Sequence, residues 1–365
     1  VATVTPATRT SADDSFQLLR SNPDGYAKVV PLTQDHQPLE FPRDHYPHED
    51  YRIEWWYLTA NLQDTAGNQY GIHWTLFRQS MNAQPNPGGW QSNQVWMAHS
   101  AISTAKGHYF DERFARGGIG QAGVELSRKA FTSHTTTAEP AFEAWLDDWL
   151  WSGSGSSPLP GKLKFTVDDI NVSLELSANT PWVLQGVDGF SQKSALGQAS
   201  YYYSQPHIDI VGEVFIEGKA IEVHGQGWLD REWSSQPLAP DQPGWDWLAI
   251  HLEDGHALMI FRLRQSNGEY WYSGSWVNEE GTSESLGSNQ LVFEPIKTSQ
   301  VRTGNDRYRA LPLHWRVELP EKKLAWEIAP VLADHWLDTA FPYWEGPIVV
   351  TGSTSGVGYL ELTGY

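Results

Sequence analysis

From about Tyr51 to the end of the chain, short segments of alternating apolar and polar residues follow one another, separated by turn signals. Residues 70–78 alternate as a half-buried strand should, and Asp254-Gly255 is a strong hairpin signal between two such segments. Many short strands at regular spacing are typical of barrels and sandwiches, because parallel crossover units would need helical segments between the strands. The sequence therefore predicts an all-β, antiparallel fold.

Two segments depart from this pattern and predict short helices. Ser11 can cap a helix that runs to Arg20. A second helix is predicted after Pro140, because apolar side chains recur at positions i, i+3, i+4 and i+7, which is one face of a helix. These side chains are Phe142, Trp145, Leu146 and Trp149. We expect this helix to pack on the outside of a barrel, with a lid over the mouth as the alternative.

The β pattern restarts in the second half of the chain, which predicts two domains. Residues 1–30 are interpreted as an N-terminal extension. Residues 31–215 form the first predicted domain and residues 216–365 the second. No clean linker marks the boundary between them, so its position follows from the strand pattern alone.

Composition excludes several classes of function. The chain carries 44 acidic and 25 basic residues, a formal charge of −19, which disfavours nucleic acids and anionic membrane surfaces as partners. It contains no cysteine, so disulfides, thiolate catalysis and cysteine-ligated zinc are excluded. No apolar run approaches the roughly 20 residues of a membrane span. The start at Val1, followed by Ala and Thr residues, indicates a trimmed export signal and predicts a periplasmic or secreted protein.

Tryptophan is unusually frequent, with 19 residues, and several indoles stand beside carboxylates. A carboxyl group against an indole is desolvated, which raises its pKa toward the range of a general acid. The candidate catalytic residues are therefore Asp230, Glu232 and Glu54. Large amphipathic rings can also line a pocket for an apolar ligand. The candidate ligand-binding residues are Trp55, Trp56, Tyr57, Trp228, Trp233, Trp245, Trp247 and Trp344.

The segment from 228 to 233 is expected to be a strand with two different faces. Alternate residues of a strand share a face, so Trp228, Asp230 and Glu232 belong together and Arg231 lies opposite them. A structural interpretation of the acids competes with the catalytic one: they could belong to a buried network of carboxylates and arginines that joins the domains. The candidate members of that network are Arg231, Arg52, Arg78, Asp246 and Glu345.

Signatures of cofactors and metals are weak. Gly356-Val357-Gly358 lacks the helix that follows a nucleotide-binding loop, and the chain has no Gly-x-Ser-x-Gly elbow. His45, His48 and Asp50 are close enough to suggest metal ligands, but the neighbouring prolines favour a surface loop. We therefore predict neither a cofactor nor a metal site.

Several separated motifs together resemble one known family. They are Glu54–Tyr57, Gly227–Ser235, Gly244–Trp247, Tyr343–Gly346 and Gly356–Tyr365. In this order they resemble the AttH-type "predicted secreted hydrolase" family, which is related to the carotenoid 1,2-hydratases, also called hydroxyneurosporene synthases. The resemblance covers roughly Phe41 to Tyr365. It implies export and two packed lipocalin-like β-barrels, the N-terminal one larger, with a ligand cleft at or near their interface.

The resemblance also implies a role for Asp230. In the carotenoid hydratases, an aspartate within a Tyr-His-Asp-His-Asn-Trp stretch is proposed to protonate an isolated double bond, and Asp230 aligns with it. The flanking residues differ: the tyrosine is Trp228, the histidines are Leu229 and Arg231, and the asparagine is Glu232. These departures argue against hydration of carotenoids themselves and leave acid-initiated addition to an alkene. Kievitone hydratase and some fungal pericyclases share the broad family, so the scaffold does not fix the reaction.

The leading prediction is an exported, lipocalin-like protein that binds an apolar or isoprenoid-like small molecule and adds water to a C=C bond. In this mechanism Asp230 is the general acid, Trp228 and Trp233 stabilise the cation through their ring faces, and Glu232 or Glu54 activates water. One alternative is a non-enzymatic carrier of lipids or hydrophobic ligands that works beside a membrane transporter. Another is a carbohydrate-active hydrolase, for which paired carboxylates are typical.

Overall fold

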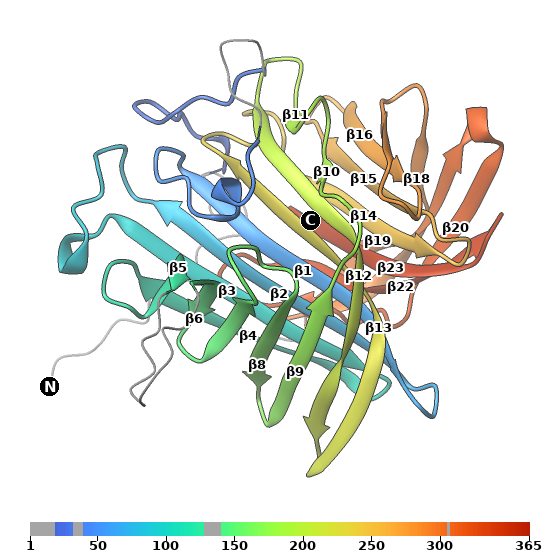
Figure 1. The fold of residues 1–365 in the computed structure, drawn as a ribbon. Helices are drawn as coiled ribbons and strands as arrows, with labels where there is room; N and C mark the ends of the chain where they lie inside the picture. The colour runs from blue at the N-terminus through green and yellow to red at the C-terminus, as the bar shows by residue number, and fades with distance from the viewer. Residues whose placement is uncertain (1–18, 32–38, 128–139, 305–306) are drawn as a thin grey trace, which may run out of the picture.

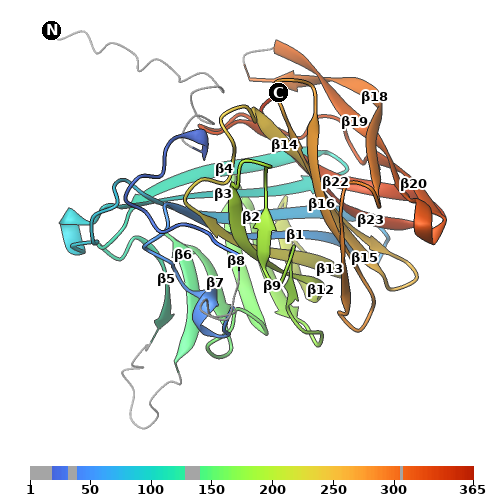
Figure 2. The same cartoon turned by 90° about the horizontal axis from the view of Figure 1, so that it is seen from above.

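The strands of the protein pair into two large antiparallel sheets, as the alternating sequence pattern predicts (Figures 1 and 2). A computed structural model describes residues 19–31, 39–127, 140–304 and 307–365. Within these ranges no helix is long and apolar enough to cross a membrane. Three 3₁₀ turns are η1 (Arg43–His45), η2 (Gly89–Gln91) and η3 (Pro320–Lys322).

The first sheet is nearly closed as a barrel. Strand β4 at one edge of the sheet contacts β6 and β8, which lie near the opposite edge. Its strand order is β4-β3-β2-β1-β13-β12-β9-β8-β7-β6-β5, with β10 and β11 beside β12. The strands are β1 (Ile53–Asp64), β2 (Gln69–Ser80), β3 (Gln94–Thr104), β4 (Gly107–Arg116), β5 (Ala122–Ser127), β6 (Ala141–Leu146), β7 (Trp149–Gly153), β8 (Gly161–Val167), β9 (Ile170–Ser177), β10 (Val183–Leu184), β11 (Phe190–Gln192), β12 (Ala199–Ile216) and β13 (Lys219–Ser234).

The second sheet has the order β17-β16-β15-β14-β23-β22-β20-β19-β18, with β21 beside β22. The strands are β14 (Gly244–Leu252), β15 (Ala257–Arg264), β16 (Tyr270–Val277), β17 (Ser283–Leu286), β18 (Val292–Thr303), β19 (Arg307–Leu319), β20 (Leu324–Pro330), β21 (Trp336–Leu337), β22 (Tyr343–Gly352) and β23 (Gly356–Thr363). The boundary predicted after residue 215 falls within the β12–β13 hairpin of the first sheet. The chain passes to the second sheet between Ser234 and Gly244.

Three apolar cores account for most of the tryptophans. Trp74, Trp149 and Trp151 are buried inside the first sheet, and a second core lies inside the second sheet. A third core joins the sheets, with Tyr57 and Trp228 from one side and partners such as Trp247, Phe261 and Tyr359 from the other. Burying aromatic side chains removes a large apolar area from water, so this third core holds the two sheets together.

The prediction of a helix after Pro140 is wrong. Residues 141–146 form β6, in which alternate side chains such as Phe142 and Leu146 are buried and Trp145 lies on the other face. A two-residue turn follows, with Asp147 in the left-handed region at φ 54°, and Trp149 then pairs with Leu146 at the start of β7. Over so short a stretch the spacings i, i+3, i+4 and i+7 do not distinguish a helix from a tight hairpin. Most of the helix predicted from Ser11 to Arg20 lies outside the described residues.

Candidate functional site

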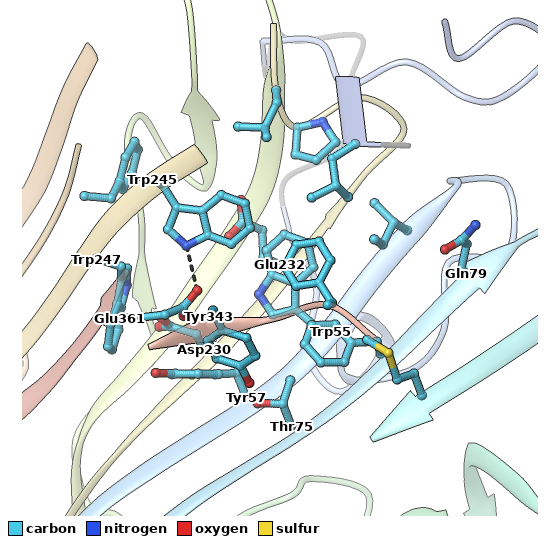
Figure 3. A pocket seen from close by; sticks show the side chains of 18 of the residues that line it. Trp55, Tyr57, Thr75, Gln79, Asp230, Glu232, Trp245, Trp247, Tyr343 and Glu361 are labelled. Atoms are coloured by element: carbon cyan, nitrogen blue, oxygen red, sulfur yellow. Dashed lines mark hydrogen bonds between the residues drawn. The ribbon is translucent and has the colours of Figure 1, made fainter. Parts of the chain in front are cut away.

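A cavity with a volume of about 270 Å³ lies between the two sheets, where the resemblance implies a ligand cleft (Figure 3). One wall comes from β1–β4 and β13 of the first sheet. The other comes from β14, β15, β22 and β23 of the second. Most of the side chains that line it are aromatic or aliphatic. Among the described lining residues, Asp230, Glu232 and Glu361 are the acids and Lys193 is the basic residue.

A single row of side chains crosses five neighbouring strands along this cavity. Strand register places Glu232 of β13 beside Trp55, Trp55 beside Phe77, Phe77 beside Met97, and Met97 beside Phe114 of β4. All of them line the cavity. Glu232 is 6% exposed and Phe114 is 52% exposed. The row therefore leads from a buried acidic end to an apolar end that opens to solvent.

Asp230 lies at the buried end and is held by three hydrogen bonds. The Tyr202 hydroxyl donates to Oδ2 at 2.6 Å, the Ser204 hydroxyl to Oδ1 at 2.5 Å, and the Trp228 indole N–H to Oδ1 at 2.7 Å. Burial raises the pKa of Asp230 to about 7, against the opposing effect of these donors, and the charge of Glu232 adds to the rise. A carboxyl group with such a pKa can act as a proton donor near neutral pH.

Glu232 faces the same cavity as an ion pair. The Lys193 ammonium lies 2.9 Å from Glu232 Oε1, and both side chains are buried. Lys193 Nζ also lies 4.0 Å from the Phe261 ring centroid and 5.0 Å from that of Tyr202, within the range of cation–π attraction. Asp230 and Glu232 therefore share the cavity face of β13, as strand alternation predicts, while Arg231 points to the opposite side.

Glu361 is a lining residue that the sequence alone did not single out. The Trp245 indole N–H donates to Glu361 Oε1 at 2.7 Å (Figure 3). Burial raises the pKa of Glu361 to about 8, and the nearby charges of Asp230 and Glu232 add to the rise. The available signal is the isolated acid between Leu360 and Leu362 on an otherwise apolar strand.

A further carboxyl group lies behind the cavity wall. Tyr57, which lines the cavity, donates its hydroxyl to Glu345 Oε1 at 2.5 Å. Glu345 Oε2 lies 3.1 Å from His73 Nδ1, and His73 Nε2 lies 2.6 Å from the Thr75 hydroxyl oxygen in the wall. Burial and the charge of Glu361 raise the pKa of Glu345 well above its usual range. Glu345, predicted as an ion-pair member, thus meets a tyrosine and a histidine here.

Glu54 lies on the far side of β1, inside the first sheet. It is 0% exposed and pairs with both Arg78 and Arg231. Burial alone would raise its pKa, but the two guanidinium charges and the contact with His48 hold the pKa well below its usual range. The Arg231 guanidinium carbon lies 3.8 Å from the ring centroid of Trp56. Of the three candidate acids, Glu54 is therefore the one that lies away from the cavity.

The other predicted site residues divide between the cavity and the cores. Trp55, Tyr57, Trp245 and Trp247 line the cavity, and Trp228 supports Asp230 from behind. The remaining indoles, Trp56, Trp233 and Trp344, belong to the apolar cores of the two sheets.

The other two predicted ion-pair residues, Asp246 and Arg52, also lie outside the cavity lining. Asp246 is paired with Arg262 at 2.7 Å and Arg264 at 2.6 Å. The Arg52 guanidinium donates to the backbone oxygen of Ser21 at 3.1 Å. The ion pairs of Asp246 lie within the second sheet, and the contact of Arg52 is a hydrogen bond to a backbone carbonyl.

The three residues considered as metal ligands have different surroundings. His45 Nδ1 lies 2.6 Å from the Tyr203 hydroxyl, His48 lies between Asp44 and Glu54, and Asp50 is exposed. In the part of the chain that the structure describes, no group of three His, Asp or Glu side chains is placed to hold a metal ion.

Stability above neutral pH is expected to fall because of the raised carboxyl pKa values. Asp230 and Glu361 hold protons in the folded state up to about pH 7 and 8, whereas in the unfolded chain they lose them near pH 4. Their contribution is complete below pH 4 and disappears as the pH rises through 7 and 8. The contribution of each group falls by about 1.4 kcal/mol per pH unit between its unfolded and its folded pKa and no longer changes above the folded pKa. Urea unfolding should therefore show a stability that falls between pH 6.5 and 8 and levels off by pH 9, and Glu361→Gln should make the fall smaller.

Below about pH 6.5 buried histidines reverse the trend. Burial lowers the pKa of His45 to about 3 and the pKa values of His251 and His335 to about 4, so these rings stay neutral in the fold and take up protons on unfolding. We therefore expect maximum stability between about pH 6 and 7. A stability that still rises between pH 7 and 9 would contradict protonated carboxyls in the folded protein.

The protein has a double lipocalin-like architecture. It consists of two antiparallel sheets, one of them nearly closed as a barrel, and an aromatic cavity with acidic residues lies between them. The sequence matches the model of the family described as AttH-like over residues 32–365. The chain belongs to the AttH-like family. A crystal structure of a protein of Nitrosomonas europaea described as an AttH has 33% sequence identity and a TM-score of 0.75, covering 93% of this chain and 99% of that one.

Two more distant solved structures share the fold. Kievitone hydratase from Nectria haematococca has 14% identity and a TM-score of 0.64, over 93% of this chain and 97% of that one. CghA in complex with Sch210972 has 12% identity and a TM-score of 0.56, over 94% of this chain and 97% of that one. At these identities the likeness concerns the fold. No curated protein matches the chain.

Proposed function

We propose that this protein binds an apolar, isoprenoid-like molecule in the cavity between the sheets and adds water to one of its C=C bonds. The observation that carries the proposal is Asp230, a buried carboxyl group whose pKa is raised to about 7 at the wall of an aromatic cavity. Kievitone hydratase, whose name states a hydration, has the same fold and adds support to this reaction class.

The reaction begins with protonated Asp230. Its proton passes to one alkene carbon, and the other carbon becomes cationic. Trp55, Trp245 and Trp247 line the cavity at this end, and aromatic ring faces attract positive charge. Asp230 is 3% and Glu232 is 6% exposed, and limited access of water to this end of the cavity would lengthen the lifetime of the cation.

The reaction ends with the attack of water. A water molecule forms a C–O bond to the cation and passes one proton to the Glu232 carboxylate, which Lys193 holds at 2.9 Å. That proton then returns to Asp230, two residues away on the same strand face, so that the protein ends in its starting state. This division of roles uses Asp230 as the acid and Glu232 as the base.

An isotope experiment tests the hydration. We expect the protein, incubated with a panel of acyclic isoprenoid alkenes in H₂¹⁸O, to form an alcohol that carries the label. The initial rate should fall as the pH rises above about 7, because the general acid must be protonated. Labelled alcohol from none of the alkenes, or a rate that increases through pH 8, would contradict the proposal.

A carrier function is the second candidate, favoured by the apolar row that opens to solvent at Phe114. In that case the protein is exported, holds a hydrophobic ligand and delivers it to a membrane transporter without changing it. Native mass spectrometry of the purified protein should then reveal a bound ligand, and the same ligand should be recovered intact after incubation. The carbohydrate alternative receives less support, because the lining is mainly aromatic and aliphatic.

A further inference from the structure

We propose that the cavity selects lipophilic cations. The positively charged head would lie among Asp230, Glu232 and Glu361, and the apolar chain would follow the side-chain row to Phe114. The inference rests on the proposed function, because it concerns the same cavity. A ligand with a permanent positive charge would lie where the carbocation forms during the proposed reaction. It goes beyond that function, because water addition to an alkene does not require the ligand itself to be charged.

Aromatic rings from both sheets surround the acidic end of the cavity. Trp55 and Tyr57 come from β1, Trp245 and Trp247 from β14, and Tyr343 from β22 (Figure 3). The Tyr57 and Trp247 rings meet edge to face with centroids 5.2 Å apart. Ring faces attract a cation within about 6 Å, and the attraction is largest where water is excluded. The two sheets together therefore form a partial aromatic cage for a positive head.

When Asp230 and Glu361 are ionised, the described residues around them supply no positive charge to balance theirs. Lys193 is already paired with Glu232. Among the described residues, the hydrogen-bond donors to Asp230 and Glu361 are neutral hydroxyl and indole groups, and neither acid has an ion-pair partner. A cationic head would supply positive charge to the ionised acids. An anionic head would meet like charges in a poorly screened site, which costs binding free energy.

The remaining length of the cavity suits an extended chain. The row from Glu232 to Phe114 crosses four inter-strand gaps of about 4.8 Å, or roughly 19 Å in all. Between its ends it consists of Trp55, Phe77 and Met97, without a charged side chain. An alkyl or isoprenoid chain lying along this row would bury its surface against these residues, while the head stays at the acidic end.

Cation binding should be linked to proton release. The titratable groups that face the head are Asp230, Glu232, Glu361, Lys193, Tyr57, Tyr202 and Tyr343, with Glu345 behind Tyr57. Burial raises the pKa values of Asp230 and Glu361 to about 7 and 8, so both are partly protonated near neutral pH. A cation favours their ionised forms, so its affinity should increase with pH across this range.

Three probes with the same chain length test the selectivity. Isothermal titration calorimetry of the full chain at pH 8 would compare decyltrimethylammonium, 1-decanol and decanoate below their micelle-forming concentrations. We expect the ammonium to bind at least about tenfold more tightly than the alcohol, and the carboxylate to bind most weakly. Repeating the titration in two buffers of different ionisation enthalpy should show protons released with the ammonium and none with the alcohol.

Variants locate the effect. Glu361→Gln keeps an acceptor for Trp245 and should reduce the preference for the ammonium at least about threefold, with the affinity for 1-decanol unchanged. Glu213→Gln makes the same change of charge at an exposed position of β12 and should leave both affinities unchanged. Phe114→Ala should lower the affinities for the ammonium and for 1-decanol by a similar factor, because it shortens the apolar row.

The proposal is overturned if decanoate binds as tightly as the ammonium, if the ammonium and the alcohol bind equally, or if none of the three binds. These comparisons use the unaltered protein, so they stand even if a variant fails to fold. A preference for the cation without any labelled alcohol would overturn the hydration and leave this inference intact. Turnover of a neutral alkene without a preference for the cation would overturn this inference and leave the hydration intact.

Discussion

Asp230→Asn is expected to lower water addition by about a hundredfold to ten-thousandfold, because the variant has no proton to donate to the alkene. The fold should survive. An asparagine can accept from Ser204 and Trp228 through its amide oxygen, and its NH₂ group can donate to Tyr202, whose hydroxyl can reverse its role. The rate of labelled-alcohol formation and the urea unfolding curve should be measured together.

The outcome distinguishes three interpretations of Asp230. Lost turnover with unchanged 1-decanol binding supports the general acid. Full turnover by the variant would eliminate Asp230 as the proton donor. A variant that unfolds would favour a structural role for the hydrogen-bonded group of Asp230, Tyr202 and Ser204. Glu213→Gln, on the exposed face of β12, controls for the change in net charge.

Glu54→Gln should destabilise the protein by about 3–5 kcal/mol, because it leaves the guanidinium groups of Arg78 and Arg231 buried without the carboxylate that both contact. Gln can replace some of the hydrogen bonds but not the charge. Urea unfolding at pH 7 would give the difference. The matched control is Glu294→Gln, which breaks an exposed pair with Arg316 and should change the stability by less than about 1 kcal/mol.

This experiment also decides between the two roles that the sequence leaves open for Glu54. A stable variant that loses turnover would mean that Glu54 takes part in the chemistry despite its position inside the first sheet. A destabilised variant whose folded fraction keeps its turnover would identify Glu54 as the structural partner of the arginines. Its separation from the cavity leads us to expect the second result.

Much of the fold could be read from local signals. Turn pairs such as Asp168-Asp169 and Glu217-Gly218 lie at the tips of observed hairpins, because left-handed or flexible residues reverse the chain there. Alternation also assigned Asp230 and Glu232 to one face of β13 and Arg231 to the other. The wrong prediction of a helix at residues 140–149 also came from local spacing. Two short strands joined by a turn of only two residues place their apolar side chains at the same sequence spacing as a helix does.

The sequence by itself determined the all-β class, the hairpins, the family and the acids of β13 as candidates. The tertiary structure decided which indoles meet the cavity: Trp55, Trp245 and Trp247 line it, whereas neighbours in the same motifs, such as Trp56 and Trp344, lie inside the sheets. It also brought Glu361 to within reach of Trp245, and Glu345 to Tyr57. The reason is physical. Alternation along a strand fixes which residues share a face, but the side that becomes the space between two sheets depends on contacts between residues hundreds of positions apart.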